Sequence, residues 1–212
     1  TPRQEGELAL TDTLSRELET RRVRGVETGG LWVDATYPWD LLTVAREVLA
    51  HDLTDEPEVE EGIWIDETAI VHEDATLQAP VVVGPDCEVG PGAVVGPQTA
   101  LGRNVTVGAN STVINTVLDV DTRVDPGSTL LETVTGQHVR FGPSTVVSGG
   151  PADVRVGNEI FEDERLGAVV ADRVEADGNV SFAPGSLVGP SAHLHTGVTV
   201  SGQVQEGTEV RR

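Results

Sequence analysis

The chain has 212 residues and a net charge of −21, from 35 acidic residues and 14 basic residues that are all arginine. An acidic surface repels phosphate, so nucleic acid is not an expected partner, and no apolar run reaches the length of a membrane span. Excess carboxylate without lysine favours a cytoplasmic protein that works in concentrated salt, where screening relieves the self-repulsion. An acidic protein that meets a basic partner is the competing interpretation.

The first 51 residues predict a small α/β segment. Leucines at helical spacing predict a helix over residues 10–22, and two short strands are predicted at 23–27 and 30–34. A second helix is predicted over 40–53 from its apolar spacing. So short a segment buries too little surface to form a core of its own. We expect either the end of an α/β domain whose main body lies outside this chain, or a segment that packs on the residues that follow.

Residues 52–62 are acidic and poor in apolar side chains, so we interpret them as a linker. Beyond them an aliphatic residue recurs at every sixth position, namely Ile65, Val71, Leu77, Val83, Val89, Val95, Leu101, Val107 and Val113. A period of six fits neither a helix nor one long strand. It is typical of a parallel β-helix of triangular section, in which aliphatic side chains point inward and stack from coil to coil. A β-sandwich with chance spacing is the alternative.

Glycines follow the aliphatic residue at 84, 90, 96, 102 and 108, where we expect turns that need positive φ or close backbone approach. The register slips once after Val113, and a second clean array runs from Val170 to Val200. Residues 148–169 break the period, and we expect a loop ejected from a corner. The prediction is a mainly β fold, with a β-helix over 63–206 and a tail over 207–212.

The only cysteine, Cys87, occupies an inward position of the hexad array. It cannot form an internal disulfide, and a buried structural thiol is a better interpretation than a catalytic one.

Two sequence runs carry a resemblance to a known family. Residues 6–12 and 30–42, the second with its Trp-x-Asp and Pro-Trp-Asp-Leu-Leu elements, resemble the end of the catalytic domain of sugar-1-phosphate nucleotidylyltransferases. The hexads resemble the single-stranded, left-handed β-helix attached to that domain in bifunctional archaeal and bacterial members. The resemblance covers nearly the whole chain. It implies a parent enzyme with two activities. One is a uridylyl- or thymidylyltransferase similar to those that act on glucose-1-phosphate, and the other is an amino-sugar-phosphate acetyltransferase.

For the nucleotidylyltransferase half, the resemblance implies a sugar-1-phosphate, a nucleoside triphosphate and Mg²⁺. The family reaction needs a glycine-rich phosphate loop with arginine and lysine, and this sequence contains neither that loop nor any lysine. Asp34 is the one position that matches, as a magnesium ligand at a strand end. A turn former is the plain alternative for this aspartate. We therefore expect no nucleotidylyl transfer from these residues alone.

For the acetyltransferase half, the resemblance implies acetyl-CoA and a catalytic histidine in a His-Leu-x-Tyr motif. That motif is absent, because the only tyrosine is Tyr37, far upstream. The candidate general bases are therefore His138, His193 and His195. His193 and His195 flank one leucine and so share the outward side of a strand. Solvated surface histidines are the alternative.

Three hypotheses follow for the β-helix. It serves assembly and regulation of the parent nucleotidylyltransferase, or it is an acetyl-CoA-dependent acetyltransferase, or it is a structural scaffold. Related solenoid enzymes pack three prisms about a threefold axis, with acyl-CoA sites between neighbours. The resemblance therefore implies a homotrimer, in which the 148–169 loop reaches toward an adjacent subunit.

Overall fold

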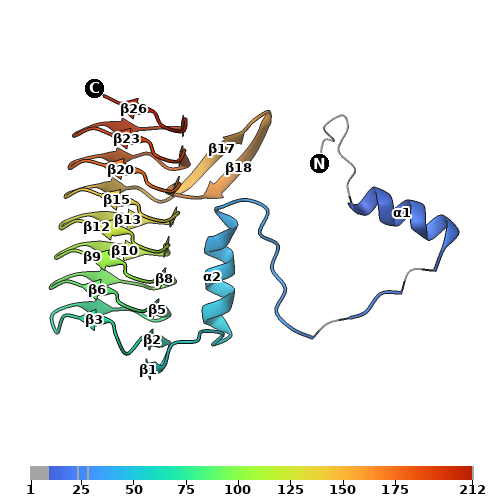
Figure 1. Cartoon of the computed structure of the whole chain (residues 1–212), viewed down its shortest axis with the longest axis horizontal. Coiled ribbons are helices and arrows are strands. Elements are labelled where there is room, and N and C mark those ends of the chain that lie inside the picture. The colour runs from blue at the N-terminus through green and yellow to red at the C-terminus, as the bar shows by residue number, and fades with distance from the viewer. Residues whose placement is uncertain (1–9, 23, 28, 212) are drawn as a thin grey trace. The chain divides into compact units, whose positions relative to one another are not determined.

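The computed structural model describes residues 10–22, 24–27 and 29–211, and it divides the chain into two compact units, Thr1–Trp32 and Val33–Arg212 (Figure 1). The first unit holds helix α1, Leu10–Thr20. The strands predicted at 23–27 and 30–34 are not formed in the described residues of those ranges, and Val23 lies outside them. A strand needs a neighbour for its backbone hydrogen bonds, and an isolated pair is marginal in water.

The second unit is a parallel β-helix, and its coils contribute one strand to each of three sheets, as the stacked arrows of Figure 1 show. In the described residues, sheet A contains β2 Ile63–Ile65, β5 Val81–Val83, β8 Thr99–Leu101, β11 Val117–Leu118, β14 Thr133–Thr135, β19 Ala168–Val170, β22 Ser186–Val188 and β25 Gln203–Val204. Sheet B contains β3 Ile70–Val71, β6 Glu88–Val89, β9 Thr106–Val107, β12 Arg123–Val124, β15 Arg140–Phe141, β20 Glu175–Ala176, β23 His193–Leu194 and β26 Glu209–Val210. Sheet C contains β4 Thr76–Leu77, β7 Val94–Val95, β10 Thr112–Ile114, β13 Thr129–Leu131, β16 Val146–Val147, β21 Ser181–Phe182 and β24 Thr199–Val200.

The hexad residues line the interior, as the six-residue period predicts. From Val83 to Val113 every aliphatic residue of the array is buried, while those of the first coil are half-buried because no coil covers them from below. The one-residue slip has a simple cause. Leu101 pairs with Val83, eighteen positions away, but Leu118 pairs with Leu101, seventeen positions away, so the coil becomes one residue shorter.

The repeating glycines are required mainly by close backbone approach rather than by positive φ. A Cβ on Gly84 would lie 2.7 Å from the carbonyl oxygen of Leu101 on the next coil. The left-handed backbone occurs two residues later, at corner residues such as Asp86 and Asn104, with φ of 59° and 55°. Short polar side chains tolerate this conformation better than most residues, and their presence at the corners follows from it.

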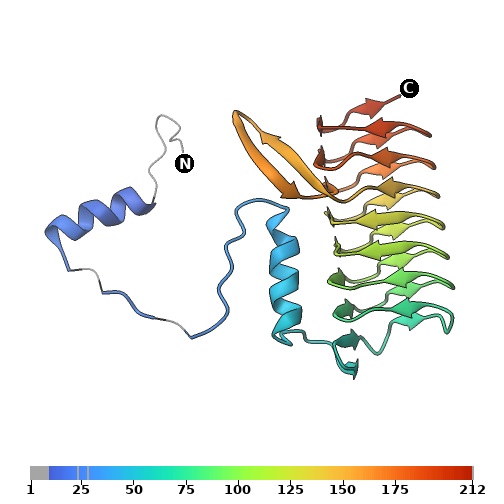
Figure 2. The ribbon, with the colours of Figure 1, turned by 180° about the vertical axis from the view of Figure 1, so that it is seen from behind.

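Helix α2, Asp40–Ala50, packs on the outer face of sheet A against β8, β11 and β14 (Figure 2). Its Asp40 carboxylate accepts a hydrogen bond from the Tyr37 backbone N–H at 2.7 Å, which fixes the first turn. Trp39 and Leu42 are buried against Val134 of the sheet. Of the segment predicted over the first 51 residues, residues 33–51 therefore belong to the same compact unit as the β-helix and pack on it through α2.

The boundaries of the β-helix differ from those predicted. Residues 52–62 are not only a linker, because β1, Glu58–Glu60, pairs antiparallel with β2 at the edge of sheet A. The tail expected at 207–212 contains β26, which pairs in parallel with β23, so the sheet continues to Val210. A hydrophobic pattern does not predict β1 or β26, because both strands are rich in polar residues and lie at the ends of their sheets, where backbone pairing chiefly holds them.

The period break at 148–169 contains an antiparallel hairpin, β17 Pro151–Val156 and β18 Glu159–Arg165. It projects from the stack beside α2 in Figures 1 and 2. Val154 and Phe161 of the hairpin join Trp39 in a second apolar cluster on the outside of sheet A. None of the described helices is both long and apolar enough to cross a membrane.

Candidate functional site

The three outer faces of the β-helix carry different chemistry, which the strand register makes explicit. The outward ladder of sheet A is almost entirely apolar, and runs Trp64, Val82, Ala100, Val117, Val134, Val169, Leu187 and Gln203. Helix α2 and the hairpin cover much of it. Tyr37 and Trp39 stack there with ring centroids 4.7 Å apart, and Phe161 meets both rings edge-on.

Sheet B and sheet C differ in charge. The outward ladder of sheet B is mostly charged, and runs Ile70, Glu88, Thr106, Arg123, Arg140, Glu175, His193 and Glu209. The outward ladder of sheet C has no charged member, and runs Thr76, Val94, Thr112, Thr129, Val146, Ser181 and Thr199. Such a neutral face is unusual in a chain of net charge −21.

Two of the predicted histidines come together on sheet B. The rings of His193 and His195 stack with centroids 4.3 Å apart. His193 Nε2 donates to Asp177 Oδ1 at 3.2 Å, and His195 Nδ1 lies 3.5 Å from Asp177 Oδ2. The hydrogen bond from His193 holds the pKa of the Asp177 carboxyl below its usual range. The far nitrogen of His195, Nε2, faces Glu209 Oε2 at 3.7 Å.

His138 does not join this group. It occupies a corner position with φ of 57°, and its Nδ1 lies 3.3 Å from Asp121 Oδ2 on the preceding coil. The strand that follows it, β15, is separated from β23 by β20, and two strand spacings amount to about 10 Å. The sequence therefore predicts three equivalent candidates, whereas the structure unites His193 and His195 and leaves His138 apart.

Asp34 lies at the surface, where it accepts a hydrogen bond from Thr36 Oγ1 at 3.1 Å. Mg²⁺ takes oxygen ligands in octahedral geometry. Among the described residues Asp34 belongs to no group of three metal-ligating side chains. One exposed carboxylate does not make a magnesium site, so Mg²⁺ chemistry at Asp34 remains a prediction for the parent enzyme.

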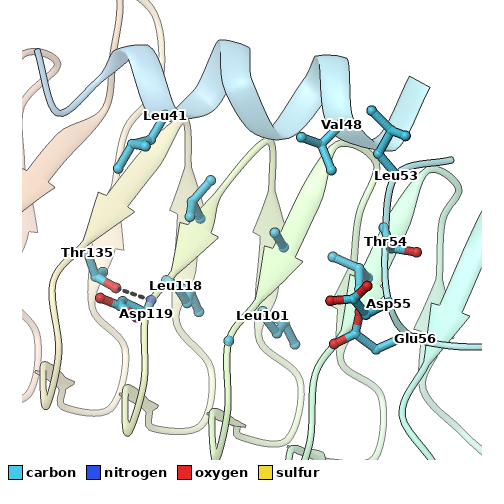
Figure 3. Close-up of a pocket in the computed structure, with 14 residues that line it drawn as sticks. Leu41, Val48, Leu53, Thr54, Asp55, Glu56, Leu101, Leu118, Asp119 and Thr135 are labelled. Carbon is cyan, nitrogen blue, oxygen red and sulfur yellow. Dashed lines mark hydrogen bonds between the residues drawn. The ribbon is translucent and has the colours of Figure 1, made fainter. Parts of the chain in front are cut away.

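A pocket of about 500 Å³ opens between α2 and sheet A (Figure 3). Leu41 and Val48 of the helix form its roof, and Leu101 and Leu118 are among the residues of its floor. Acidic side chains also line it, at Asp55, Glu56 and Asp119. An apolar groove with carboxylates repels phosphate groups, so this pocket does not suit a nucleotide or a coenzyme A tail.

The sequence reasoning missed Asp177 and Glu209, although a signal for both was present. Asp177 lies 18 residues before His195 and Glu209 lies 16 residues after His193, and each separation equals the length of one coil at that point of the β-helix. A shift by one coil from each histidine would have placed these carboxylates on the neighbouring strands.

The coil geometry defines the class as a hexapeptide-type parallel β-helix. Residues 59–183, more than half of the chain, match the family described as the GMPPB C-terminal domain, and the chain belongs to that family. It is 31% identical to the bifunctional protein GlmU of Methanococcus maripaludis, over 99% of this chain and 54% of that protein. It is 28% identical to a bifunctional sugar-1-phosphate nucleotidylyltransferase/acetyltransferase of Sulfurisphaera tokodaii, over 95% of this chain and 54% of that protein. The chain thus spans about half the length of the curated relatives that it matches.

Solved structures with a similar solenoid include a putative acetyltransferase from Bacillus cereus, at a TM-score of 0.38 and 10% identity over 66% of this chain and 71% of that one. A perosamine N-acetyltransferase from Caulobacter crescentus, in complex with CoA and GDP-perosamine, gives a TM-score of 0.29 and 13% identity over 81% and 61%. The parallel strands and their register define the fold of this chain.

Proposed function

We propose that this chain is the β-helix part of a cytoplasmic sugar-1-phosphate nucleotidylyltransferase and that the β-helix assembles the enzyme as a homotrimer. The parent would act on a sugar-1-phosphate and a nucleoside triphosphate with Mg²⁺. The names of the archaeal relatives support the parent activity. The uncharged outer ladder of sheet C is the observation that supports assembly.

Charge decides which face would meet another copy. Two chains of net charge −21 repel each other unless the contact excludes charge. Sheet A is largely covered by the chain's own helix and hairpin, and sheet B presents arginine, glutamate and histidine. Sheet C presents threonine, valine and serine, with Val146 40% exposed. Its flat, β-branched surface would bury apolar area without desolvating any ion.

The experiment is a molar-mass measurement by light scattering in molar KCl, which screens the long-range repulsion. Wild type is expected to be a trimer, and Val146→Glu is expected to dissociate it by placing a charge between copies. Thr106→Glu is the matched control, since it adds the same charge at an outward position of sheet B. A monomeric wild type, or equal effects of the two variants, contradicts assembly through sheet C.

Acetyl transfer is the second candidate, because one observation favours it. A histidine that a carboxylate orients can accept the proton of an attacking amine, and His193 with Asp177 has that arrangement. In this case acetyl-CoA raises the melting temperature of wild type with EDTA present, whereas His193→Ala, which lacks the base, loses acetyl transfer. If acetyl-CoA does not shift the melting temperature of wild type, the acetyl-transfer candidate is excluded, and assembly or a purely structural scaffold is left.

A further inference from the structure

We propose that Asp177, His193 and His195 form a binding site for a divalent transition-metal ion such as Zn²⁺ on the outer face of sheet B. Each residue offers one ligand atom, and these atoms lie within 4.8 Å of one another. The inference is independent of the proposed assembly, because it concerns a face that the assembly does not use, and it shares His193 and Asp177 with the acetyl-transfer candidate.

The ligand atoms lie close to the separations that a metal ion requires. Zinc bonds of about 2.1 Å in tetrahedral geometry place neighbouring ligand atoms roughly 3.4 Å apart. His193 Nε2 lies 3.2 Å from Asp177 Oδ1, and His195 Nδ1 lies 3.5 Å from Asp177 Oδ2. These contacts join the two histidines to different oxygens of Asp177, and the three ligand atoms lie within 4.8 Å of one another, so side-chain rotations would bring one oxygen and both nitrogens around a single ion.

The backbone positions the three ligands in advance. His193 and His195 lie two residues apart at β23, so their side chains share the outward side. Asp177 follows β20, the neighbouring strand, and its backbone N–H donates to the carbonyl oxygen of Leu194 between the two histidines. Their placement on two bonded strands lowers the entropy that binding would otherwise cost.

The donor set selects the type of ion. Two imidazole nitrogens and one carboxylate suit Zn²⁺, Co²⁺, Ni²⁺ or Cu²⁺, whereas Mg²⁺ and Ca²⁺ take oxygen ligands. The surroundings are mainly acidic, since Glu175 and Glu209 pair with His193 on either side in the sheet. Half-exposed histidines also leave an open position for water or a fourth ligand.

Glu209 and Arg211 have opposite effects on the site. Glu209 Oε2 faces His195 Nε2 at 3.7 Å, which places a carboxylate behind the coordinating ring as in many metal sites. Arg211 Nε donates to the same ring nitrogen at 3.3 Å and brings a positive charge near the ion. A bound metal would require His195 to release Arg211 and turn its Nε2–H toward Glu209.

The test uses Co²⁺ and Zn²⁺ alone as probes of the whole chain. Wild type is expected to give the visible absorption of nitrogen-ligated, tetrahedral Co²⁺, to saturate at a single ion per chain, and to melt at higher temperature with Zn²⁺. His193→Ala, His195→Ala and Asp177→Asn should each weaken binding by at least roughly 10- to 100-fold, while Arg211→Gln should strengthen it. All four side chains lie on the surface, so metal-free melting temperatures check that folding is intact.

His138→Ala is the matched control, because it removes a histidine that faces a carboxylate on the same side of the solenoid. It should leave Co²⁺ absorption and Zn²⁺ affinity unchanged. The proposal is overturned if wild type shows only the weak absorption of hydrated Co²⁺, or if His138→Ala and His193→Ala reduce affinity equally. Equal loss would mean that the ion binds the acidic surface in general.

Discussion

The Glu132 carboxylate binds both ends of the hairpin insertion, Arg165 at one end and Gly150 at the other. Glu132 Oε1 accepts from Arg165 Nε at 3.0 Å and from Nη2 at 2.9 Å, at the end of β18. Its other oxygen, Oε2, accepts from the backbone N–H of Gly150 at 2.7 Å, just before β17 begins. The Glu132 side chain is only 10% exposed, so both ends of the insertion are held from within the coil.

Arg165→Met is expected to loosen the hairpin. The substitution leaves a nearly buried carboxylate with only the Gly150 N–H as partner, at a cost of about 1–3 kcal/mol. Limited proteolysis between residues 150 and 166 should accelerate, and the free energy of unfolding should fall within that range. Arg155→Met, on the same hairpin, is the control. Equal proteolysis of the two variants would show that the pair does not hold the insertion.

Val107→Asp is expected to unfold the β-helix. Val107 is fully buried in the coil interior, and an unpaired charge there costs several kcal/mol. Thr106 precedes it on the same strand and points outward, so Thr106→Asp should melt close to wild type. Circular dichroism melts of the two variants decide whether the inward register is as described.

Stability is expected to increase with salt. Net charge of −21 opposes the compact state, and salt shortens the screening length from about 10 Å at 0.1 M to about 3 Å at 1 M. The melting temperature should rise steadily from roughly 0.1 to 3 M KCl. A flat profile across that range would contradict the interpretation that the composition is an adaptation to concentrated salt.

Cys87 is expected to resist alkylation in the folded chain. It is fully buried, its Sγ–H donates to the Gly102 carbonyl oxygen at 2.9 Å, and burial raises its pKa from 9.0 to about 11. The thiol ionises at lower pH in the unfolded chain than in the folded chain. The free energy of unfolding should therefore fall as pH rises from 9 toward 11. Iodoacetamide labelling at pH 8 should proceed only with denaturant, and rapid labelling without it would show that the coil opens locally.

The sequence predicted the coil interior well because each hexad residue obeys a local rule. Val83 and Phe182 point inward for the same reason, since a short strand alternates its side chains and a turn follows. Packing of the N-terminal segment on the β-helix was one of two expected alternatives, but the face that α2 covers could not be predicted, because it depends on the outward ladder of several coils at once. The same limit hid the partners of His193, which become neighbours only when the coil length is known.

The turn chemistry was predicted only in part. Gly84 allows two coils to approach, while the positive φ belongs to Asp86, and a hexad pattern does not distinguish these roles. Glu132 illustrates the point further. It lies at a corner with φ of 49°, and in the sequence nothing distinguishes it from an ordinary surface glutamate. It nevertheless binds Arg165, 33 residues away at the far end of the insertion.

The proposed assembly through sheet C is tested most directly by comparing thiol labelling on two faces. Thr129→Cys places a thiol outward on sheet C, and Thr106→Cys places one outward on sheet B, while Cys87 is buried and is expected to contribute no background. At concentrations where wild type is a trimer in molar KCl, the thiol at 129 should label slowly, and dilution should restore its rate to that of the thiol at 106. Equal labelling rates of the two thiols at every concentration would contradict the proposal.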